Sequence, residues 1–387
     1  MKILQISNYY YPNIGGIEQV ARDIVRSLKT EQNVEQKVIC FNENASNGNL
    51  VCKRNETKHD FVDGVEIIRC GCFTKVRSQS ISLTYPRELK RVLDNFMPDI
   101  VIFHYPNPFV ASILLGQRKR DFKLVLYWHL DITKQRILRK LFHRQNLRLI
   151  KRADRIVGAT PMHVNQSYYS VSFKDKKEVL PYAIDEQRLI ISPEEMDEAT
   201  RIKARYADKV IAFSIGRHVP YKGIRYLIEA SKLLGKANIV FIIAGEGELT
   251  QSLKLQAQGD DKVLFVGKIS DSEWRAYLQA CDIFCFPSIT RNEAFGLAQA
   301  EAMSYGKPVV TFTISHSGVN FVNLDGVTGI ECPNADAAAY ASALKNLVES
   351  ATLRRQYGLQ AKDRVQENFS AEKFKVNLLQ LLDSLLK

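Results

Sequence analysis

Short apolar runs alternate with helix-like patterns through both halves of this 387-residue chain. Short apolar runs separated by helical segments are typical of buried parallel strands that are covered by helices. The expected strands of the first half are Lys2–Ile6, Gln36–Phe41, Val65–Arg69, Ile100–Phe103, Leu124–Trp128 and Arg155–Gly158, and its clearest helices are Ile17–Leu28 and Pro86–Asn95. The alternation therefore predicts an α/β fold built on parallel sheets.

The second half repeats the alternation with better periodicity. Its expected strands are Val210–Ile215, Asn238–Ala244, Val263–Phe265, Ile283–Phe286 and Val309–Phe312, and the connecting helices are Ile224–Leu234, Glu248–Ala257, Asp271–Ala280 and Phe295–Tyr305. A chain of this length exceeds one ordinary core, so we expect two Rossmann-like domains, over residues 1–185 and 186–370. The last helix, within residues 371–387, is long enough to cross back over the domain boundary.

The positive charge of the chain is confined to its first half. Residues 1–185 contain 30 Lys and Arg against 18 Asp and Glu, whereas residues 186–387 contain 24 of each. This imbalance predicts that the first domain meets an anionic surface or substrate. Seven cysteines, an odd number without metal-ligand spacing, suit a reducing cytoplasm. With no signal-like start and no apolar stretch of about 18 residues, we expect a cytoplasmic protein that spans no membrane.

The segment from Thr133 to Arg155 concentrates this charge, with nine Lys or Arg against one acid, Asp154. Its apolar stripe consists of Leu138, Leu141, Phe142 and Leu149. One interpretation is a basic amphipathic helix on an anionic membrane surface, and the other is an ordinary helix whose stripe covers the sheet. The two are compatible. No helix-turn-helix, zinc-finger or RNP-like motif accompanies the charge, which argues against nucleic acid as a partner.

Residues 287–308, PSITRNEAFGLAQAEAMSYGKP, hold the most suggestive polar group. A loop that carries Glu293 turns there into a helix that carries Glu301. The first N–H groups of such a helix form an anion site, and the small side chains let a ligand approach the backbone. On helical geometry the two carboxylates would lie about 12 Å apart along the axis and could hold both ends of one elongated polar ligand. The alternative is an Ala-rich packing helix with two solvated glutamates.

Other strand ends of the second half carry residues that suit the same ligand. Arg217 and Lys222 follow the strand Val210–Ile215 and offer two cations to a diphosphate. Glycine-marked turns follow the next two strands, at Gly245 and at Gly267-Lys268-Ile269. They could line a nucleotide base pocket, although simple turns explain them equally well.

The first half has three candidates at its own strand ends. Gly15 and Gly16 permit positive φ at a helix start, which suits either a phosphate cradle or a tight turn. His104 and His129 end two expected strands, in IVIFHYP and LVLYWHLD, where ligands of open parallel sheets gather. Each histidine is therefore a functional candidate, with a satisfied structural role as the alternative.

Together these motifs resemble the retaining glycosyltransferases of family GT4, which have the GT-B fold of two Rossmann-like domains. The resemblance covers nearly the whole chain and rests on PNIGGIEQ, IGRHVPYKG, AGEGE, LFVGKIS and above all PSITRNEAFGLAQAEAMSYGKPVV. Glu293 and Glu301 match the E-x7-E motif of that family. Asn292 departs from the glycine or small residue of many members and leaves the sugar specificity open. The chain is also similar to bacterial O-antigen and capsule members, several of them mannosyltransferases.

The resemblance implies a role for each candidate. Glu301 would bind the ribose of a sugar nucleotide, Glu293 the hydroxyls of the transferred sugar, and His129 would lie near the anomeric carbon. The implied donor-binding residues are Gly15, Gly16, Arg217, Lys222, Gly245, Ile269, Glu293, Ala294, Phe295, Gly296, Leu297 and Glu301. Gly16 would approach the phosphates from the other domain when the cleft closes.

The expected reaction needs no metal and no other cofactor. Arg217 and Lys222 would neutralise the leaving diphosphate, and the chain contains no Asp-x-Asp motif. No carboxylate is placed as a nucleophile, so we expect same-face transfer with retention, in which His129 orients the sugar or stabilises charge. GDP-mannose is the first expected donor and a UDP-sugar the second. The expected acceptor is a lipid-linked or other saccharide, reached from the inner face of an anionic membrane by a peripherally bound enzyme.

Two other functions remain open from the sequence. A sugar-nucleotide 2-epimerase shares the architecture and binds the same kind of ligand, although the E-x7-E match favours transfer. An inactive sugar-nucleotide-binding protein would not need the intact set of Arg217, Lys222, Glu293 and Glu301.

Overall fold

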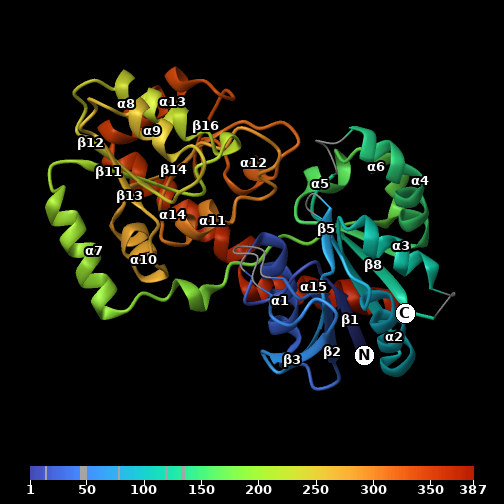
Figure 1. Cartoon of the computed structure of the whole chain (residues 1–387). Coiled ribbons are helices and arrows are strands. Elements are labelled where there is room, and N and C mark those ends of the chain that lie inside the picture. Colours follow the sequence, from blue (N-terminus) through green and yellow to red (C-terminus); the bar gives the residue numbers. More distant parts are fainter. Residues whose placement is uncertain (14, 44–49, 77–78, 118–120, 132–135) are drawn as a thin grey trace. The chain divides into compact units, whose positions relative to one another are not determined.

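The computed structural model describes residues 1–13, 15–43, 50–76, 79–117, 121–131 and 136–387, and the side chains of these residues except 76, 79 and 136–139. The chain forms two compact units (Figure 1). The first unit consists of residues 1–183 and 371–387, and the second of residues 184–370. Sequence analysis had placed the division between residues 185 and 186. Each unit is built on its own mainly parallel sheet.

The described part of the first unit contains an eight-stranded sheet in the order β10-β9-β8-β7-β1-β2-β4-β3. Its strands are β1 Lys2–Ile6, β2 Glu35–Phe41, β3 Thr57–Val62, β4 Val65–Cys70, β7 Ile100–Tyr105, β8 Lys123–Trp128, β9 Arg155–Gly158 and β10 Lys177–Val179. All neighbours pair in parallel except β3, which returns on β4 through a turn at Asp63 and Gly64 with positive φ at both. A separate two-stranded hairpin joins β5 Thr74–Val76 and β6 Gln79–Ile81.

Among the strands of this sheet, sequence analysis missed β3. This strand contains no apolar run, because all six of its side chains are exposed or half-buried.

The helices of the first unit lie between these strands in the chain. They are α1 Gly16–Leu28, α2 Tyr85–Phe96, α3 Pro108–Gly116, α4 Arg136–Arg152, α5 Pro161–Asn165, α6 Ser170–Phe173 and α15 Ala371–Leu386, with a 3₁₀ turn, η1, at Lys174–Lys176. The last of them, α15, follows the second unit in the chain but packs against α1 (Figure 1). An ion pair of 2.8 Å between Lys375 Nζ and Glu31 Oε1 flanks this packing.

The apolar stripe expected on the basic helix is divided in the structure. Leu149 of α4 is fully buried in the core of the first unit, whereas the Leu141 side chain is 68% exposed. Thr133 and the side chain of Leu138 lie outside the described residues. The helix therefore covers the sheet through its second half and presents at least one large apolar side chain to solvent in its first half.

The second unit contains a parallel sheet in the order β13-β12-β11-β14-β15-β16. Its strands are β11 Val210–Ile215, β12 Ile239–Ala244, β13 Val263–Gly267, β14 Ile283–Phe286, β15 Val309–Phe312 and β16 Gly329–Cys332. Its helices are α7 Pro193–Arg205, α8 Ile224–Leu233, α9 Thr250–Gln256, α10 Asp271–Ala280, α11 Leu297–Ser304, α12 Val319–Val322, α13 Ala337–Glu349 and α14 Ala351–Asn368, with 3₁₀ turns η2 Glu186–Leu189 and η3 Pro220–Lys222. The two mainly parallel sheets confirm the expected α/β fold with one sheet in each unit.

One helix start differs from the sequence-based expectation. We predicted a helix from Phe295, but α11 begins at Leu297 because Gly296, its N-cap residue, has a φ of +83°. A Cβ atom at Gly296 would lie 2.8 Å from Gln299 Nε2 and 3.1 Å from the Phe286 ring, so only glycine fits this turn. Glu293 consequently lies in the loop before α11, and the distance estimated along one helix does not apply.

All seven cysteines are free thiols, and six of them are buried. In the described part of the chain, no helix combines the length and the apolar character that crossing a membrane requires.

The packing of α15 on the first unit yields a stability prediction. Leu382 is fully buried, whereas Leu386, on the same helix, is 48% exposed. Leu382→Ala is expected to lower the free energy of unfolding of the first unit by about 2–4 kcal/mol, and Leu386→Ala by less than about 0.5 kcal/mol. Each unit holds one of the two tryptophans, so urea unfolding followed through Trp128 in a Trp274→Phe background reports on the first unit. Equal effects of the two substitutions would contradict the packing.

Candidate functional site

Three loops of the second unit meet at the carboxyl edge of its sheet. They follow β11, β12 and β14, which are adjacent parallel strands and therefore end on the same side. A Cβ atom at Gly223 would lie 2.0 Å from the Pro287 carbonyl oxygen, and one at Gly245 would lie 2.0 Å from the Gly216 carbonyl oxygen. Both glycines have positive φ. The loops therefore approach each other to a distance that a side chain would prevent.

The loop between β14 and α11 is held by two contacts from the segment before α12. The Ser317 hydroxyl donates to the Glu293 carbonyl, and the Gly318 N–H donates to the Ala294 carbonyl at 2.9 Å. Buried Gln299 donates from Nε2 to the Phe295 carbonyl at 3.0 Å. The backbone that leads into α11 is therefore fixed. Its first turn provides N–H groups that have no acceptor within the helix.

Glu293 and Lys222 form an ion pair at this edge. Lys222 Nζ contacts Glu293 Oε2, and the Ser288 hydroxyl donates to the same oxygen at 3.2 Å. The two charged side chains are only 17% and 14% exposed. The structure thus joins two residues that the sequence analysis had assigned separately, Glu293 to sugar hydroxyls and Lys222 to the diphosphate. A ligand that binds to either side chain must therefore displace the contact between Lys222 and Glu293.

Arg217 lies exposed beside this pair, in the loop after β11. Its guanidinium contacts the Tyr221 hydroxyl at 3.4 Å from Nη2, and Lys222 Nζ lies 5.5 Å from the centre of the Tyr221 ring. The two cations therefore flank one aromatic side chain at the edge from which α11 starts.

Glu301 forms a second ion pair on α11. Its Oε1 lies 3.1 Å from Nη1 of Arg188, and its side chain is 16% exposed. Burial raises the pKa of Glu301 to about 7, while the charge of Arg188 opposes that rise. Sequence analysis missed Arg188, because nothing in the stretch IDEQRL distinguishes it from a solvated arginine. Only folding brings residue 188 to residue 301.

Gly245 and Ile269 lie in the loops after β12 and β13. The Gly245 N–H donates to the Gly267 carbonyl at 2.7 Å, which ties the two loops together. Ile269 is half-buried and directly precedes Ser270, the N-cap of α10. The structure brings both residues to the same edge as Glu301, while their expected contact with a base stays a prediction.

The glycine pair of the first unit lies at the start of α1. Gly15 caps α1 with a φ of −163°, an extended conformation, and Gly16 is the first helical residue without positive φ. Glu18 explains the first glycine, because a Cβ atom at Gly15 would lie 2.3 Å from Glu18 Oε2. The pair therefore does not use the positive φ that glycine permits, and Gly15 instead makes room for a carboxylate at the helix start.

Four buried side chains of the first unit form one hydrogen-bonded chain. His104 Nε2 lies 3.0 Å from Gln5 Oε1, and His104 Nδ1 lies 3.0 Å from His129 Nε2. His129 Nδ1 lies 2.6 Å from the Tyr182 hydroxyl. None of the four residues is more than 5% exposed. Burial lowers the pKa of both histidines, that of His104 to about 3, so both rings are neutral at neutral pH.

The direction of every hydrogen bond in this chain follows from Gln5. Its Nε2 donates to the Ala21 carbonyl at 3.2 Å, which leaves Oε1 as the atom that faces His104. A carboxamide oxygen only accepts, so His104 carries its proton on Nε2 and accepts on Nδ1. His129 must then donate from Nε2 and accept on Nδ1 from the Tyr182 hydroxyl. Protein groups thus occupy both ring nitrogens of His129, and its expected contact with a sugar stays a prediction.

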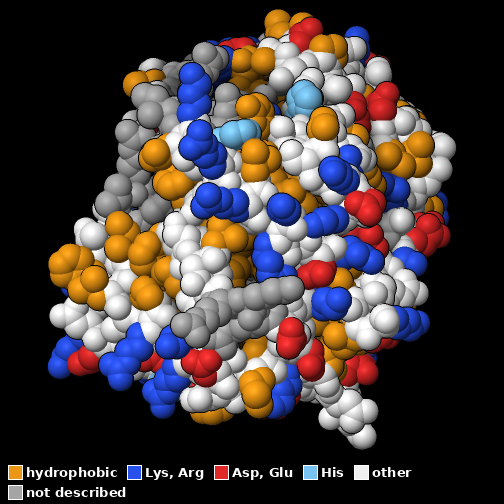
Figure 2. Space-filling model, turned by 90° about the vertical axis from the view of Figure 1, so that its right-hand side faces the viewer, with side chains coloured by type: hydrophobic (Ala, Val, Ile, Leu, Met, Phe, Trp, Pro, Cys, Tyr) orange, Lys and Arg blue, Asp and Glu red, His pale blue; other side chains and the backbone are white. Residues whose placement is uncertain are grey.

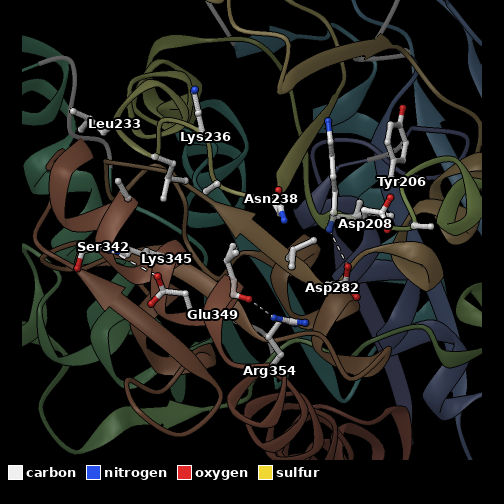
Figure 3. Close-up of a pocket in the computed structure, with 18 of the residues that line it drawn as sticks. Tyr206, Asp208, Leu233, Lys236, Asn238, Asp282, Ser342, Lys345, Glu349 and Arg354 are labelled. Carbon is white, nitrogen blue, oxygen red and sulfur yellow. Dashed lines mark hydrogen bonds and ion pairs between the residues drawn. The ribbon is translucent and has the colours of Figure 1, made fainter.

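A cavity of about 1060 Å³ lies at the opposite edge of the second unit's sheet (Figure 3). It is lined where β11, β12 and β14 begin, at Val210, Asn238 and Asp282. Lys236, Lys345, Glu349 and Arg354 surround it (Figure 3). Functional groups of open parallel sheets gather at the carboxyl ends, and none of the site residues predicted from the sequence lines this cavity. Its size alone gives it no role.

Metal binding is not apparent in the described residues. Among them, no group of three or more His, Cys, Asp and Glu side chains is arranged to hold a metal ion.

Comparison with known proteins gives matches over both units. Residues 195–364 match the family model described as glycosyl transferases group 1, and residues 14–188 match that of glycosyltransferase family 4. The chain is 26% identical over 375 residues to O-antigen chain mannosyltransferase C of Escherichia coli, covering 96% of this chain and 95% of that protein. It is 31% identical over 280 residues to D-rhamnosyltransferase WbpZ of Pseudomonas aeruginosa, covering 70% of each.

Among solved structures, the Anabaena protein Alr3699/HepE in complex with UDP-glucose is similar, with a TM-score of 0.75. The alignment has 16% identity and covers 99% of this chain and 100% of that one. At this identity the likeness concerns the fold.

The derived proton positions of His104 and His129 can be observed directly. In ¹⁵N-labelled protein, both imidazoles are expected to be neutral with the proton on Nε2 from about pH 5 to about pH 8, because burial disfavours their charged forms. Long-range ¹H–¹⁵N correlation spectra measure this, and His104→Gln and His129→Gln assign the signals. A proton on Nδ1 of either ring, or titration of either ring within that range, would refute the derived hydrogen-bond directions.

Proposed function

This chain belongs to the glycosyltransferases of group 1 and family 4, and from that premise we propose that it transfers a hexosyl group from a nucleotide-diphosphate sugar to a lipid-linked or other saccharide acceptor in surface-polysaccharide assembly. The single observation that carries the proposal is two neighbouring ion pairs, Lys222 with Glu293 in the loop before α11 and Arg188 with Glu301 within α11. They set two carboxylates and two cations around a helix N-terminus.

The donor would lie across this group with its two ends on different carboxylates. A carboxylate accepts hydrogen bonds from vicinal hydroxyls, so Glu301 suits the ribose and Glu293 the transferred sugar. The diphosphate between them carries negative charge, which the N–H groups of Gly296 and Leu297 and the helix dipole favour. Gly296 keeps that backbone open to the ligand, because it has no side chain.

Charge stabilisation at the leaving diphosphate would come from Arg217 and Lys222. Negative charge develops there as the glycosidic bond breaks, and fixed cations lower the barrier to that step. Two cations supply this stabilisation without a divalent ion, so we propose metal-independent transfer. Glu293 is committed to Lys222 and the sugar rather than free as a nucleophile, which favours same-face transfer with retention of configuration.

The donor is proposed to be GDP-mannose first and a UDP-sugar second. The Escherichia coli relative is named as a mannosyltransferase, which supports mannose. The Pseudomonas relative is named as a rhamnosyltransferase, and the similar Anabaena structure contains UDP-glucose. The named relatives therefore support a nucleotide-linked hexose as a class more strongly than any one sugar.

The acceptor is proposed to be lipid-linked because of the charge of the first unit. On its surface, Lys and Arg side chains lie between hydrophobic ones (Figure 2). Lys140, Arg144 and Arg148 of α4 are exposed, as is the apolar Leu141. An apolar side chain among basic ones is the pattern that binds to the headgroup region of an anionic bilayer. The protein would thus reach its acceptor from the membrane surface as a peripheral enzyme.

Binding measurements distinguish the ribose contact proposed for Glu301 from the diphosphate contact proposed for Lys222. Glu301→Ala is expected to weaken binding of both a nucleoside and its diphosphate at least about tenfold, because the ribose loses its acceptor. Lys222→Ala is expected to weaken binding of the diphosphate but not of the nucleoside, since a nucleoside carries no negative charge that Lys222 could neutralise. Isothermal titration with uridine, UDP, guanosine and GDP in EDTA measures both.

Arg201→Gln is the matched control, because it removes an exposed cation of α7 whose ion pair is with Glu198 of the same helix. If the wild-type chain binds no nucleoside diphosphate, or if Glu301→Ala binds as tightly as wild type, the proposed donor site is incorrect. If binding requires a divalent ion, only the proposal of a metal-independent mechanism is contradicted, and the proposed donor site is not.

Membrane binding tests the acceptor side. The triple variant Lys140→Gln, Arg144→Gln and Arg148→Gln is expected to bind phosphatidylglycerol-containing vesicles at least about tenfold more weakly, because each basic residue near the headgroups contributes up to about 1 kcal/mol. Its control neutralises three exposed lysines of the second unit, Lys232, Lys236 and Lys254, by Gln. Sedimentation with vesicles measures the affinity. Equal binding of the wild type to anionic and neutral vesicles would contradict the membrane proposal.

A further inference from the structure

Arg188 is held at the donor site by the segment that opens the second unit. Its backbone lies in η2, which the Asp185 side chain caps by accepting from the Arg188 N–H at 3.2 Å. Arg275 of α10 donates to the Arg188 carbonyl at 3.1 Å, and the Tyr305 hydroxyl donates to the Leu189 carbonyl at 2.7 Å. The segment is therefore tied to both α10 and α11, and the position of Arg188 is fixed by its surroundings.

The guanidinium of Arg188 has three partners. Nη1 lies 3.1 Å from Glu301 Oε1, and Nη2 lies 3.2 Å from Asp271 Oδ1 at the start of α10. The guanidinium carbon lies 4.4 Å from the centre of the Trp274 ring, a cation–π contact. An arginine that contacts two carboxylates and one aromatic face has little freedom to turn away. Its charge therefore acts on Glu301 from a defined direction.

The remaining charges around Glu301 oppose Arg188. In the described chain, Asp271 and Asp185 act to raise the pKa of Glu301, as burial does, and Arg188 acts to lower it. The nearby Tyr305 is neutral, because burial raises its pKa to about 12. With a pKa of about 7, Glu301 exchanges its proton near neutral pH. The ion pair with Arg188 thus affects what fraction of Glu301 is ionised near neutral pH.

The ionised form is the one that a ribose needs. Two vicinal hydroxyls donate two hydrogen bonds, and a carboxylate has an acceptor for each, whereas a protonated carboxyl group offers one of its oxygens as a donor. We propose that Arg188 is a positioning residue of the donor site, which raises the ionised fraction of Glu301 and orients its carboxylate for the ribose of a nucleoside diphosphate. This inference rests on the proposed function and assigns to Arg188 no contact with the reacting atoms.

A purely structural Arg188 would have a different signature. If it only tied η2 to α10, its loss would weaken ligand binding by the same factor at every pH. If it instead occupied the place of the ribose on Glu301, its loss would strengthen binding. The electrostatic role alone predicts a loss that depends on pH, because above the raised pKa Glu301 ionises without help.

The experiment compares the affinities of wild type, Arg188→Gln and Arg188→Lys for GDP and for UDP between about pH 6 and about pH 9.5. Each is expressed as a ratio to wild type at the same pH, which cancels the titration of the ligand. Arg188→Gln is expected to bind about fivefold or more weakly near pH 6.5 and within about twofold of wild type near pH 9.5. Arg188→Lys keeps the charge and is expected to restore most of the affinity near pH 6.5.

A double-mutant cycle adds a readout that does not depend on the pH range. In a Glu301→Gln background the carboxylate is absent, so Arg188→Gln is expected to change the affinity by less than about twofold at any pH. Thermal unfolding of each variant without ligand checks that it is folded, and Arg201→Gln controls for the loss of one positive charge from the unit.

The outcomes separate the two claims. The inference is overturned if the affinity of Arg188→Gln relative to wild type stays constant across the pH range, whether that ratio is equal to, below or above one. It is also overturned if Arg188→Gln weakens binding as much in the Glu301→Gln background as in the wild type. These results leave the donor site standing if Glu301→Ala still weakens binding. Failure of the wild type to bind either diphosphate at any pH overturns the proposed function, and the inference with it.

Discussion

The close approach of loop backbones at the carboxyl edge of the second sheet is the constraint on which the proposed donor site depends. Gly223 and Gly245 allow the loops after β11, β12 and β14 to touch where a single Cβ atom would separate them. That contact brings Lys222 from one loop to Glu293 of another. Gly296 then turns the chain into α11 with a backbone conformation that other residues rarely adopt. The charged side chains are therefore placed by residues that carry no chemistry themselves.

The electrostatics of this edge follow from burial. Glu293 and Glu301 are both mostly buried carboxylates, and removing a carboxylate from water is costly unless a cation or hydrogen bonds compensate. Lys222 and Arg188 supply that compensation in the chain without ligand. A diphosphate that attracts Lys222 would supply a new partner for that cation and would release Glu293 for a sugar. The same contacts thus compensate the buried carboxylates in the free chain and, in the proposed function, would exchange for contacts with an anionic ligand.

Much of this arrangement could be predicted from the sequence, and the part that could not has physical reasons. The strand and helix alternation predicted both parallel sheets, because buried parallel strands must be continuously apolar. Strand β3 was missed because an edge strand paired antiparallel has no such run. The start of α11 was misplaced by two residues, because the positive φ of Gly296 depends on Phe286 and Gln299 around it.

The site residues divide in the same way. Glu293, Glu301, Arg217 and Lys222 were selected as candidates because residue type, strand-end position and the E-x7-E spacing point to them before folding, and their roles stay predictions. Arg188 was not, since its partners are more than 80 residues away in the chain and its own surroundings in sequence carry no pattern. His129 was found by position, but only the structure reveals that Gln5, His104 and Tyr182 determine its proton and occupy both of its ring nitrogens.

A crystal structure of the chain with a bound nucleoside diphosphate tests the central claim most directly. The account predicts the ribose within hydrogen-bond distance of the Glu301 carboxylate, and the diphosphate at the start of α11 with Lys222 drawn toward it from Glu293. Density for the nucleotide in the cavity at the opposite edge of the sheet, beside Lys236 and Lys345, would contradict it.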